Sequence, residues 1–369
     1  MAVSRPRVTL LRGHSANPWD LRPWELLAGR YDVRVLATGS NQFALDSLRL
    51  PVERVGALRD RLPRGRFGDV GALVLGDRYL GLEEALAGSD IVHAAEIGVP
   101  YSHGPALLKE RLGFRLVLTV WETIPFGAAY RRFRGRRQRE ETIPRVDLFL
   151  AATDRARAAL LLEGVEPERI EVAPPGVDPE RFASTEPPES HLVVSVGRLV
   201  WEKGHQDLLR ALAWLRRRGH APRALIVGTG PEEPRLRAHA HDLGLDGSVE
   251  WRGGLPHDEL PAVFRQASCF VLASLPTMWW EEQFGMVLAE AASAGVPIVA
   301  SDSGAIPEVL RGAGTLFPAG DWRALAAALE AIVASPPRRE HRDDVVETYT
   351  ARAAADRYAA AYERVLSSP

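Results

Sequence analysis

The chain has 369 residues, of which 46% are apolar and 25% charged, and its formal net charge at pH 7 is −2. This composition is ordinary for a globular protein and excludes the disordered, fibrous and strongly basic nucleic-acid-binding classes. The length predicts two domains, because one domain usually takes about 100 to 200 residues. We expect a cytoplasmic protein, since the sequence offers neither a membrane-spanning apolar run nor the apolar core of a signal peptide.

Short apolar runs alternate with helical patterns from the first residues onward, as in a doubly wound α/β sheet. The first half predicts strands at Val8–Arg12, Val33–Ala37, Ile91–Ala94, Leu116–Val120 and Leu148–Ala151. The second half predicts strands at Leu192–Val196, Ala224–Val227, Val249–Trp251, Cys269–Ala273, Ile298–Ala300 and Thr315–Phe317, with a helix over Asp207–Arg218. The proline-rich segment Pro174–Pro188 breaks both patterns and predicts a linker between two Rossmann-like domains.

A loop with two cations follows the strand at 192–196. It contains Gly197, Arg198, Lys203 and Gly204, and the next helical pattern begins directly after it. Ligands of open α/β sheets bind at such carboxyl ends, and two cations beside glycines suit a diphosphate. Lys203 is also one of two lysines among 46 Lys and Arg residues, which indicates a need for a compact ammonium or, equally, a chance remainder. A surface turn with solvated charges remains an equal alternative on this local pattern.

A second motif runs from Glu282 to Glu290. A helix beginning near Gly285 would present the backbone amides of Gly285, Met286 and Val287 as a second phosphate-binding position. The two glutamates lie at most about 12 Å apart along a helix, so one carboxylate could accept hydrogen bonds from a sugar and the other from a ribose. The alternative is a capping acid followed by an unrelated helix glutamate.

Together these motifs resemble the family 4 retaining glycosyltransferases of GT-B fold. The resemblance covers the C-terminal half through the order and spacing of Gly197-Arg198-Leu199, Glu202-Lys203-Gly204, Val227-Gly228-Thr229-Gly230-Pro231, Phe284-Gly285, Ala294-Gly295-Val296-Pro297, Ser303-Gly304 and Pro307-Glu308. It implies an α/β protein in which two Rossmann-like domains face each other across a cleft. Residues 1–178 would bind the acceptor, with the C-terminal helix at 351–369 packing back on them, and residues 189–345 would bind a nucleotide sugar.

The resemblance also implies roles for single residues. Arg198 and Lys203 would stabilise the departing diphosphate, Glu282 would contact the donor sugar, and Glu290 the ribose. The donor, a UDP- or GDP-linked sugar, would also contact Gly197, Phe284, Gly285, Met286 and Val287. The sequence contains no Asp-x-Asp triplet, so we expect transfer without a metal or another cofactor.

The N-terminal half departs from the family pattern. Trp121 and Glu122 stand where many relatives have a histidine, and the first loop lacks the usual double glycine. Glu122 is expected to orient the acceptor hydroxyl as a catalytic residue, and Trp121 to stack on a sugar or, equally, to close the core. The other residues expected on the acceptor side are Asn17, His93, Glu96, Tyr101 and His103.

Several other features are open to more than one interpretation. Six arginines within Arg131–Arg139 could contact an anionic membrane or a lipid-linked acceptor, although such runs are more often solvated helix faces. Cys269 lies in an apolar run and is expected to be a buried strand residue. The competing functions are a GT-B epimerase or phosphorylase and a catalytically silent nucleotide-sugar binder. A nicotinamide-dependent dehydrogenase is disfavoured, because Glu233 stands where the third glycine of its motif belongs.

Overall fold

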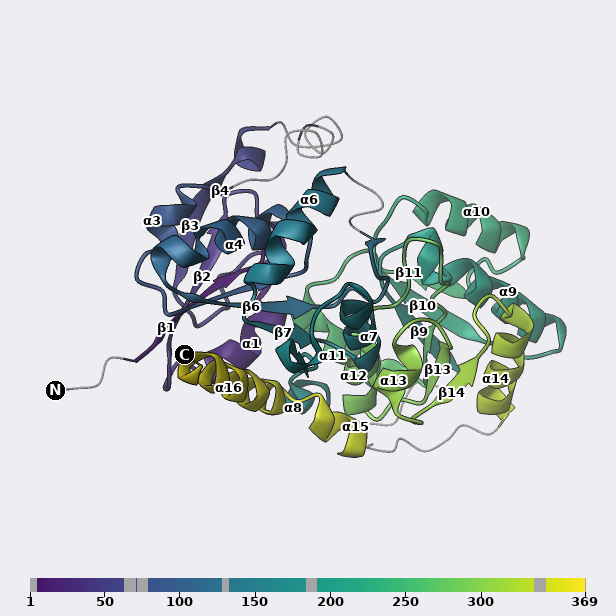
Figure 1. The fold of residues 1–369 in the computed structure, drawn as a ribbon. Coiled ribbons are helices and arrows are strands. Elements are labelled where there is room, and N and C mark those ends of the chain that lie inside the picture. The colour runs from purple at the N-terminus through teal and green to yellow at the C-terminus, as the bar shows by residue number, and fades with distance from the viewer. Residues whose placement is uncertain are drawn as a thin grey trace. The chain divides into compact units, whose positions relative to one another are not determined.

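The computed structural model describes residues 5–62, 71, 79–127, 133–183, 191–334 and 343–368. The chain divides into two compact units (Figure 1). Unit 1 consists of Met1–Gly176 together with Ala351–Pro369, and unit 2 consists of Val177–Thr350. The chain therefore leaves unit 1, forms all of unit 2, and returns to unit 1.

Unit 1 is built on an eight-stranded sheet of order β4-β3-β2-β1-β5-β6-β7-β8. All neighbouring strands are parallel except β3 and β4, and the order reverses between β1 and β5. The strands are β1 (Arg7–Leu11), β2 (Asp32–Thr38), β3 (Val52–Ala57), β4 (Tyr79–Leu80), β5 (Ile91–Ala95), β6 (Arg115–Val120), β7 (Leu148–Ala151) and β8 (Ile170–Val172). The helices are α1 (Pro18–Glu25), α3 (Leu82–Leu86), α4 (Pro100–Leu112), α6 (Phe133–Thr142), α7 (Asp154–Leu162) and α16 (Ala351–Ser367).

The central strands of unit 1 are buried on both faces, as their near-continuous apolar sequences require in a parallel sheet. One face packs with side chains of α1 and α16, and the other packs with side chains of α4 and α7. The indole of Trp24 on α1 stacks on Tyr358 of α16 at a centroid distance of 4.4 Å, and its Nε1 donates to the Tyr362 Oη over 2.7 Å. The C-terminal helix is thus part of the core of unit 1.

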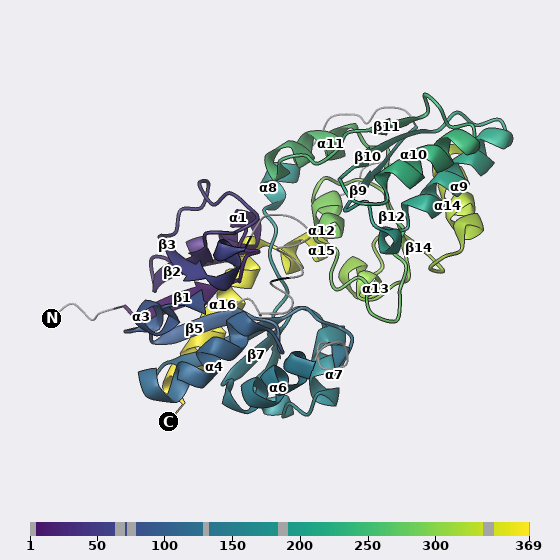
Figure 2. The ribbon, with the colours of Figure 1, turned by 90° about the horizontal axis from the view of Figure 1, so that it is seen from above.

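Unit 2 has a six-stranded, fully parallel sheet of order β11-β10-β9-β12-β13-β14. On one side of this sheet α9 packs against α14, and on the other α12 packs with α8 and α13 (Figure 2). The strands are β9 (Leu192–Val196), β10 (Arg223–Val227), β11 (Val249–Trp251), β12 (Cys269–Leu272), β13 (Ile298–Ser301) and β14 (Thr315–Phe317). The helices are α8 (Pro179–Phe182), α9 (His205–Arg217), α10 (Glu233–Asp242), α11 (Leu260–Gln266), α12 (Met286–Ser293), α13 (Ile306–Leu310), α14 (Trp322–Ala334) and α15 (Asp343–Thr348).

The predicted linker is wrong over its middle part. Residues 177–183 belong to unit 2, where α8 packs on α11 and α12 and the ring of Phe182 is buried against Phe264. Residues 184–190 of the chain, which include the end of the predicted linker, lie outside the described residues. The division at Gly176 lies two residues before the predicted end of the first domain, and the return at Ala351 coincides with the start of the predicted C-terminal helix.

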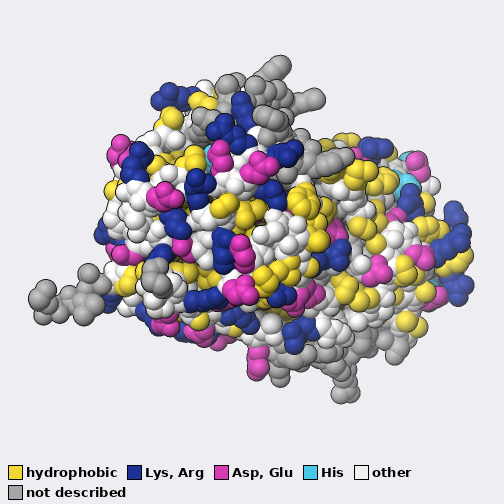
Figure 3. All heavy atoms as spheres, viewed as in Figure 1, with side chains coloured by type: hydrophobic (Ala, Val, Ile, Leu, Met, Phe, Trp, Pro, Cys, Tyr) yellow, Lys and Arg dark blue, Asp and Glu magenta, His cyan; other side chains and the backbone are white. Residues whose placement is uncertain are grey.

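The structure also shows how Cys269 is buried and how charge is distributed on the surface. Cys269 is fully buried in β12, as predicted, and its burial raises the pKa of the thiol to about 12. Basic and acidic side chains are interspersed over the face seen in Figure 3. Among the described helices, none has the length and apolar character that a membrane crossing requires.

Candidate active site

The candidate site in unit 2 lies where its strand order reverses, at the carboxyl ends of β9 and β12. Gly197 and Arg198 follow β9, and Ser274 lies two residues beyond the end of β12. The loop after β9 approaches β12 closely because Gly204 has no side chain: a Cβ there would lie 1.7 Å from the Ala273 carbonyl oxygen. The fold therefore presses the cationic loop predicted from sequence against the neighbouring strand end.

Lys203 and Glu282 form the central ion pair of this site. The Lys203 Nζ lies 2.7 Å from Glu282 Oε2, and the same oxygen accepts a hydrogen bond from Ser274 Oγ over 2.7 Å. Only 14% of the Lys203 side chain and 8% of the Glu282 side chain are exposed, so the pair is well shielded from water. The ammonium also lies 4.9 Å from the centroid of the Trp280 ring. Glu282 Oε1 makes no hydrogen bond within the described ranges and is left for another donor.

Arg198 presents an exposed guanidinium at the same strand end, and this group makes no ion pair with the described part of the chain. The loop below it is held by His205, whose Nε2 lies 3.3 Å from the Arg198 carbonyl oxygen. Since a carbonyl only accepts, Nε2 carries the proton, and Nδ1 accepts from Ser195 Oγ over 3.3 Å. Burial lowers the pKa of His205 to about 4. A neutral histidine therefore fixes the loop without adding charge to it.

Helix α12 provides unit 2 with a helix N-terminus and with a second buried carboxylate, that of Glu290. Because the helix begins at Met286, the amides of Met286 and Val287 have no carbonyl partner within the helix. Glu290, one turn further on, is buried, and its Oε1 accepts a hydrogen bond from His257 Nε2 over 2.7 Å. Its Oε2 is buried and has no hydrogen-bond partner among the residues that the structure describes. An unpaired buried carboxylate oxygen is costly, and this oxygen can still accept hydrogen bonds from a further donor.

Phe284, a predicted donor contact, lies two residues before the start of α12. Its ring is buried and lies edge-on to Tyr349 with centroids 5.1 Å apart. The side chain therefore anchors the loop before α12 in the core of unit 2. Gly285, directly before the helix, is in the left-handed conformation with φ of 76°.

A second group of polar residues lies in unit 1, where β1, β5 and β6 end. Glu122 Oε1 accepts hydrogen bonds from the amides of Thr123 and Ile124, each over 3.0 Å. Glu96 Oε1 accepts from the amide of Trp121 over 2.9 Å. Burial raises the pKa of the Glu96 carboxyl to about 7, and the nearby Glu122 charge acts in the same direction. The predicted residues Glu96, Trp121 and Glu122 are thus brought together.

The other predicted acceptor residues lie in different surroundings. His93 is fully buried, with Nδ1 2.7 Å from Tyr362 Oη and Nε2 2.7 Å from Thr119 Oγ1, which contradicts the expected acceptor contact. Asn17 caps α1, because its Oδ1 accepts a hydrogen bond from the amide of Asp20 over 2.8 Å. The ring of Tyr101 packs on Gly13, where a Cβ would lie 2.8 Å from Tyr101 Cδ1.

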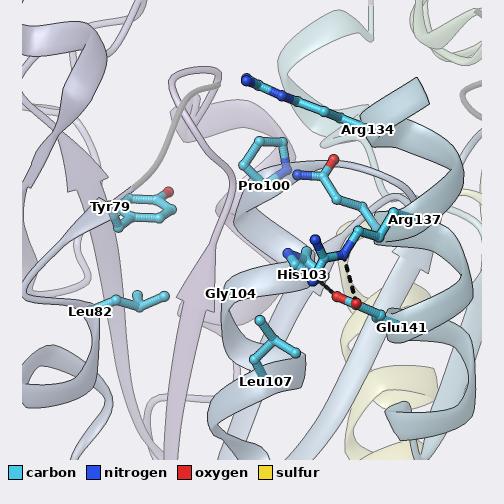
Figure 4. A pocket seen from close by; sticks show the side chains of 10 residues that line it. Tyr79, Leu82, Pro100, His103, Gly104, Leu107, Arg134, Arg137 and Glu141 are labelled. Carbon is cyan, nitrogen blue, oxygen red and sulfur yellow. Dashed lines mark hydrogen bonds and ion pairs between the residues drawn. The ribbon is translucent and has the colours of Figure 1, made fainter. Parts of the chain in front are cut away.

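His103 lines a separate cavity of about 490 Å³ in unit 1 (Figure 4). Its Nε2 lies 2.6 Å from Glu141 Oε2, and Glu141 Oε1 also accepts from Arg137 Nε over 2.8 Å. Arg136 and Arg139, from the same arginine-rich run, pair with Glu140 and Glu163. These acidic partners neutralise much of the predicted basic face, while Arg131 and Arg132 lie outside the described residues. The cavity is lined by Tyr79, Leu82, Pro100, His103, Gly104, Leu107, Arg134, Arg137, Gln138 and Glu141.

The sequence reasoning missed three residues that support the site in unit 2. Ser274 could have been found, since it follows a predicted strand at the edge where the ligand is expected. His205 contacts the Arg198 carbonyl seven residues earlier in the chain, and His257 contacts Glu290 through the tertiary fold. No spacing in the sequence marks His257, because it is 33 residues away from its partner.

Two family models match successive parts of the chain. Residues 24–181 match the model described as Glycosyltransferase Family 4, and residues 177–349 match the model described as Glycosyl transferases group 1. The chain belongs to glycosyltransferase family 4. In this family 4 chain the second match contains every predicted donor-binding residue.

Curated relatives match the family 4 chain over part of their length. The GDP-mannose-dependent alpha-(1-6)-phosphatidylinositol monomannoside mannosyltransferase of Mycolicibacterium smegmatis is 39% identical over 155 residues, which cover 40% of each chain. The putative colanic acid biosynthesis glycosyltransferase WcaL of Salmonella typhimurium is 34% identical over 196 residues, covering 52% of this chain and 48% of WcaL. The chain therefore matches less than half the length of either relative.

Solved structures match the whole family 4 chain. HepE of Anabaena, in complex with UDP and glucose, has a TM-score of 0.76 at 18% identity, and the match covers 98% of this chain and 100% of HepE. Sucrose-phosphate synthase from Thermosynechococcus elongatus has a TM-score of 0.75 at 20% identity, and the match covers 98% of this chain and 99% of the synthase. These likenesses show that the fold is GT-B, as predicted.

Proposed function

We propose that this chain is a retaining glycosyltransferase that moves a hexosyl group from a UDP- or GDP-linked sugar to a hydroxyl acceptor without a metal. The observation that carries the proposal is the shielded Lys203–Glu282 pair beside the exposed guanidinium of Arg198, at the strand ends where α/β sheets bind nucleotides. Family membership agrees with this assignment.

Each part of a nucleotide sugar has a matching group in unit 2. Arg198, Lys203 and the first amides of α12 suit the diphosphate, while the unpartnered Oε2 of Glu290 suits ribose hydroxyls. The free Oε1 of Glu282 suits a hydroxyl of the donor sugar. Contacts to the ribose and sugar fix the orientation of the donor, so that the reacting anomeric carbon is held in one place.

Charge stabilisation is the main chemical task in this mechanism. As the anomeric bond breaks, negative charge develops on the departing diphosphate, and the two preorganised cations Arg198 and Lys203 stabilise it. These cations perform what a divalent metal would otherwise do, which is why we propose metal-independent transfer. The departing phosphate oxygen takes the proton of the acceptor hydroxyl on the same face of the sugar, so the configuration is retained.

The relatives narrow the substrates to be tried first. The mycobacterial relative is named for GDP-mannose and a phosphatidylinositol mannoside, whereas the Anabaena structure holds UDP and glucose. We propose GDP-mannose and UDP-glucose as first donors, and a glycan or lipid-linked hydroxyl as acceptor near Trp121 and Glu122. A cytoplasmic location, with contact to an anionic membrane through Arg131–Arg139, completes the proposal.

A thermal-shift panel with GDP, UDP and their sugar conjugates, with and without EDTA, tests the proposed function. A ligand at 100 times its dissociation constant should stabilise the folded protein by about 2.7 kcal/mol. Arg198→Ala should weaken nucleotide binding about 10- to 100-fold, the value of a lost charge-assisted hydrogen bond, and leave the unliganded melting temperature unchanged. Arg217→Ala, an exposed arginine at the far end of α9, is the matched control. No shift with any nucleotide, or equal binding by both variants, would refute the assignment.

A further inference from the structure

Glu96 has an unusual backbone for a residue at a strand end. Its φ is +60°, in the left-handed region that costs a residue with a side chain about 1 to 2 kcal/mol. Its amide donates to the Thr119 carbonyl over 2.8 Å, and its Oε1 accepts from the Trp121 amide over 2.9 Å. The structure thus holds the strained residue from both backbone and side chain, and such strain is concentrated at functional sites.

Glu96 lies at the edge of the sheet where unit 1 is expected to bind a ligand. It follows β5 directly, and β5 lies beside β1 at the reversal of strand order. The Glu96 side chain is half-buried. His93, which lies within β5 three residues earlier, is instead fully buried in the core. Glu96 is therefore the polar side chain of this strand end that a ligand can reach.

The charged groups facing Glu96 are Glu122 after β6 and Arg12 after β1. Two backbone amides, those of Thr123 and Ile124, donate to Glu122 Oε1. The Arg12 guanidinium donates through NH1 to the carbonyls of Leu11 and His93, each over 3.0 Å, and forms no ion pair with Glu96. Glu96 is thus a carboxylate next to a second carboxylate, without a cation bound to it in the described ranges.

We propose that Glu96, rather than Glu122, is the catalytic residue that accepts the hydrogen bond of the reacting acceptor hydroxyl. This inference rests on the proposed function and assigns the acceptor side of the same reaction. Glu96 accepts the hydrogen bond of the acceptor hydroxyl and so fixes its orientation, and the proton still ends on the departing diphosphate. Glu122 acts through Glu96 as a positioning residue, because its charge adds to the effect of burial in raising the pKa of the Glu96 carboxyl.

A definite pH dependence follows from this arrangement. The ionised carboxylate of Glu96 is the stronger acceptor of this hydrogen bond, and the pKa of Glu96 is raised to about 7. The rate of transfer should therefore rise with pH through about 7. Glu122→Gln keeps the oxygen that binds the Thr123 and Ile124 amides but removes the charge, so it should lower the pKa of Glu96 and move this rise to lower pH.

The test compares Glu96→Gln and Glu122→Gln with Glu110→Gln, a control at an exposed glutamate on α4. The donors are GDP-mannose and UDP-glucose. Transfer of the sugar is measured with phosphatidylinositol monomannoside as acceptor and, in separate assays, with water as the acceptor. Glu96→Gln should keep the nucleotide-induced thermal shift, lose about 100-fold in kcat and lose the rise near pH 7. Glu122→Gln should show the rise of the pH profile moved to lower pH, and Glu110→Gln should match the unaltered protein.

A carbon-13 NMR titration of the Glu96 carboxyl gives a second measurement that needs no turnover. We expect a midpoint near 7 that falls in Glu122→Gln. The inference is overturned if Glu96→Gln keeps kcat within about twofold, if the pH profile of Glu122→Gln does not move, or if Glu96 titrates at an ordinary glutamate pKa of about 4.3. Absence of any nucleotide shift in the unaltered protein would instead refute the proposed function.

Discussion

The only two lysines in the sequence, Lys109 and Lys203, have similar surroundings in the structure. Lys109 Nζ lies 2.8 Å from both Asp147 Oδ1 and the Arg145 carbonyl oxygen, as Lys203 Nζ lies 2.7 Å from Glu282 Oε2. Each ammonium thus sits in a partly buried position with its carboxylate partner. The scarcity of lysine indicates where a compact cation is needed. The scarcity of lysine does not by itself show which of the two has a structural role, as Lys109 does, and which is the proposed catalytic residue, Lys203.

Removing the ammonium of Lys203 should reduce stability as well as nucleotide binding. In Lys203→Met the Glu282 carboxylate stays buried and keeps the Ser274 hydroxyl as a donor, so we expect the free energy of unfolding to fall by about 3 kcal/mol. Urea denaturation measures the change. The double variant Lys203→Met/Glu282→Gln should regain much of this loss, because no uncompensated charge remains. Equal stability of the single variant and the unaltered protein would contradict the described pair.

At the scale of elements, helix α9 is bounded by two left-handed glycines in different surroundings. Gly204 has a φ of +68° and lies against Ala273, whereas Gly219 has a φ of +89° and open space within 4 Å of the point where a Cβ would lie. Gly219→Ala should therefore cost only the backbone strain, about 1 kcal/mol. Gly204→Ala should cost about 4 kcal/mol or more, because the new methyl overlaps a carbonyl oxygen.

Thermal or urea denaturation of both glycine variants measures this difference. Nucleotide binding should also fall in Gly204→Ala alone, since the cationic loop is displaced from the end of β12. Similar costs for the two substitutions would show that the close approach at Gly204 is absent.

The predicted strands of the central sheets agree with the structure because their apolar runs are buried on both faces. Leu148–Ala151 and Leu192–Val196 have the predicted bounds, and so do the partly exposed edge strands Val249–Trp251 and Thr315–Phe317. The strand β3, near one edge of its sheet, was missed, since Val52–Ala57 carries exposed Glu53 and Arg54 and lacks a continuous apolar run. The short strands β4 and β8 have only two and three residues.

The candidate site was predictable in unit 2 to the extent that its residues lie next to strand ends or at a helix start. Arg198 and Lys203 follow a clear strand, and Met286 begins a clear helix. The prediction for His93 failed because burial depends on the tertiary fold: Tyr362, 269 residues further along the chain, contacts His93. Local sequence does not contain that contact.

At the scale of the whole molecule, the two units differ in how much of each is continuous in sequence. Unit 2 is one stretch, Val177–Thr350, whereas unit 1 needs α16 to cover Trp24, Tyr31 and His93. We expect residues 177–350 expressed alone to unfold cooperatively and to bind the nucleotide found by the thermal-shift panel. Residues 1–176 alone should lack a cooperative transition, because the face that α16 covers is exposed to water.

Circular dichroism during heating distinguishes the two fragments, and adding a peptide of residues 351–369 to the 1–176 fragment is the control. The peptide should restore part of the transition. A cooperative transition of the 1–176 fragment without the peptide would show that α16 is dispensable for folding of unit 1.

The return of the chain to unit 1 also sets an order of events during protein synthesis. Domains generally fold as they emerge from the ribosome, the N-terminal one first. Here α16 emerges only after all of Val177–Thr350 has been made, so unit 2 can finish folding while unit 1 still exposes the side chains around Trp24. At a synthesis rate of about 5 to 20 residues per second, that interval lasts roughly ten seconds or more. During this time the nascent chain has an apolar surface to which chaperones can bind.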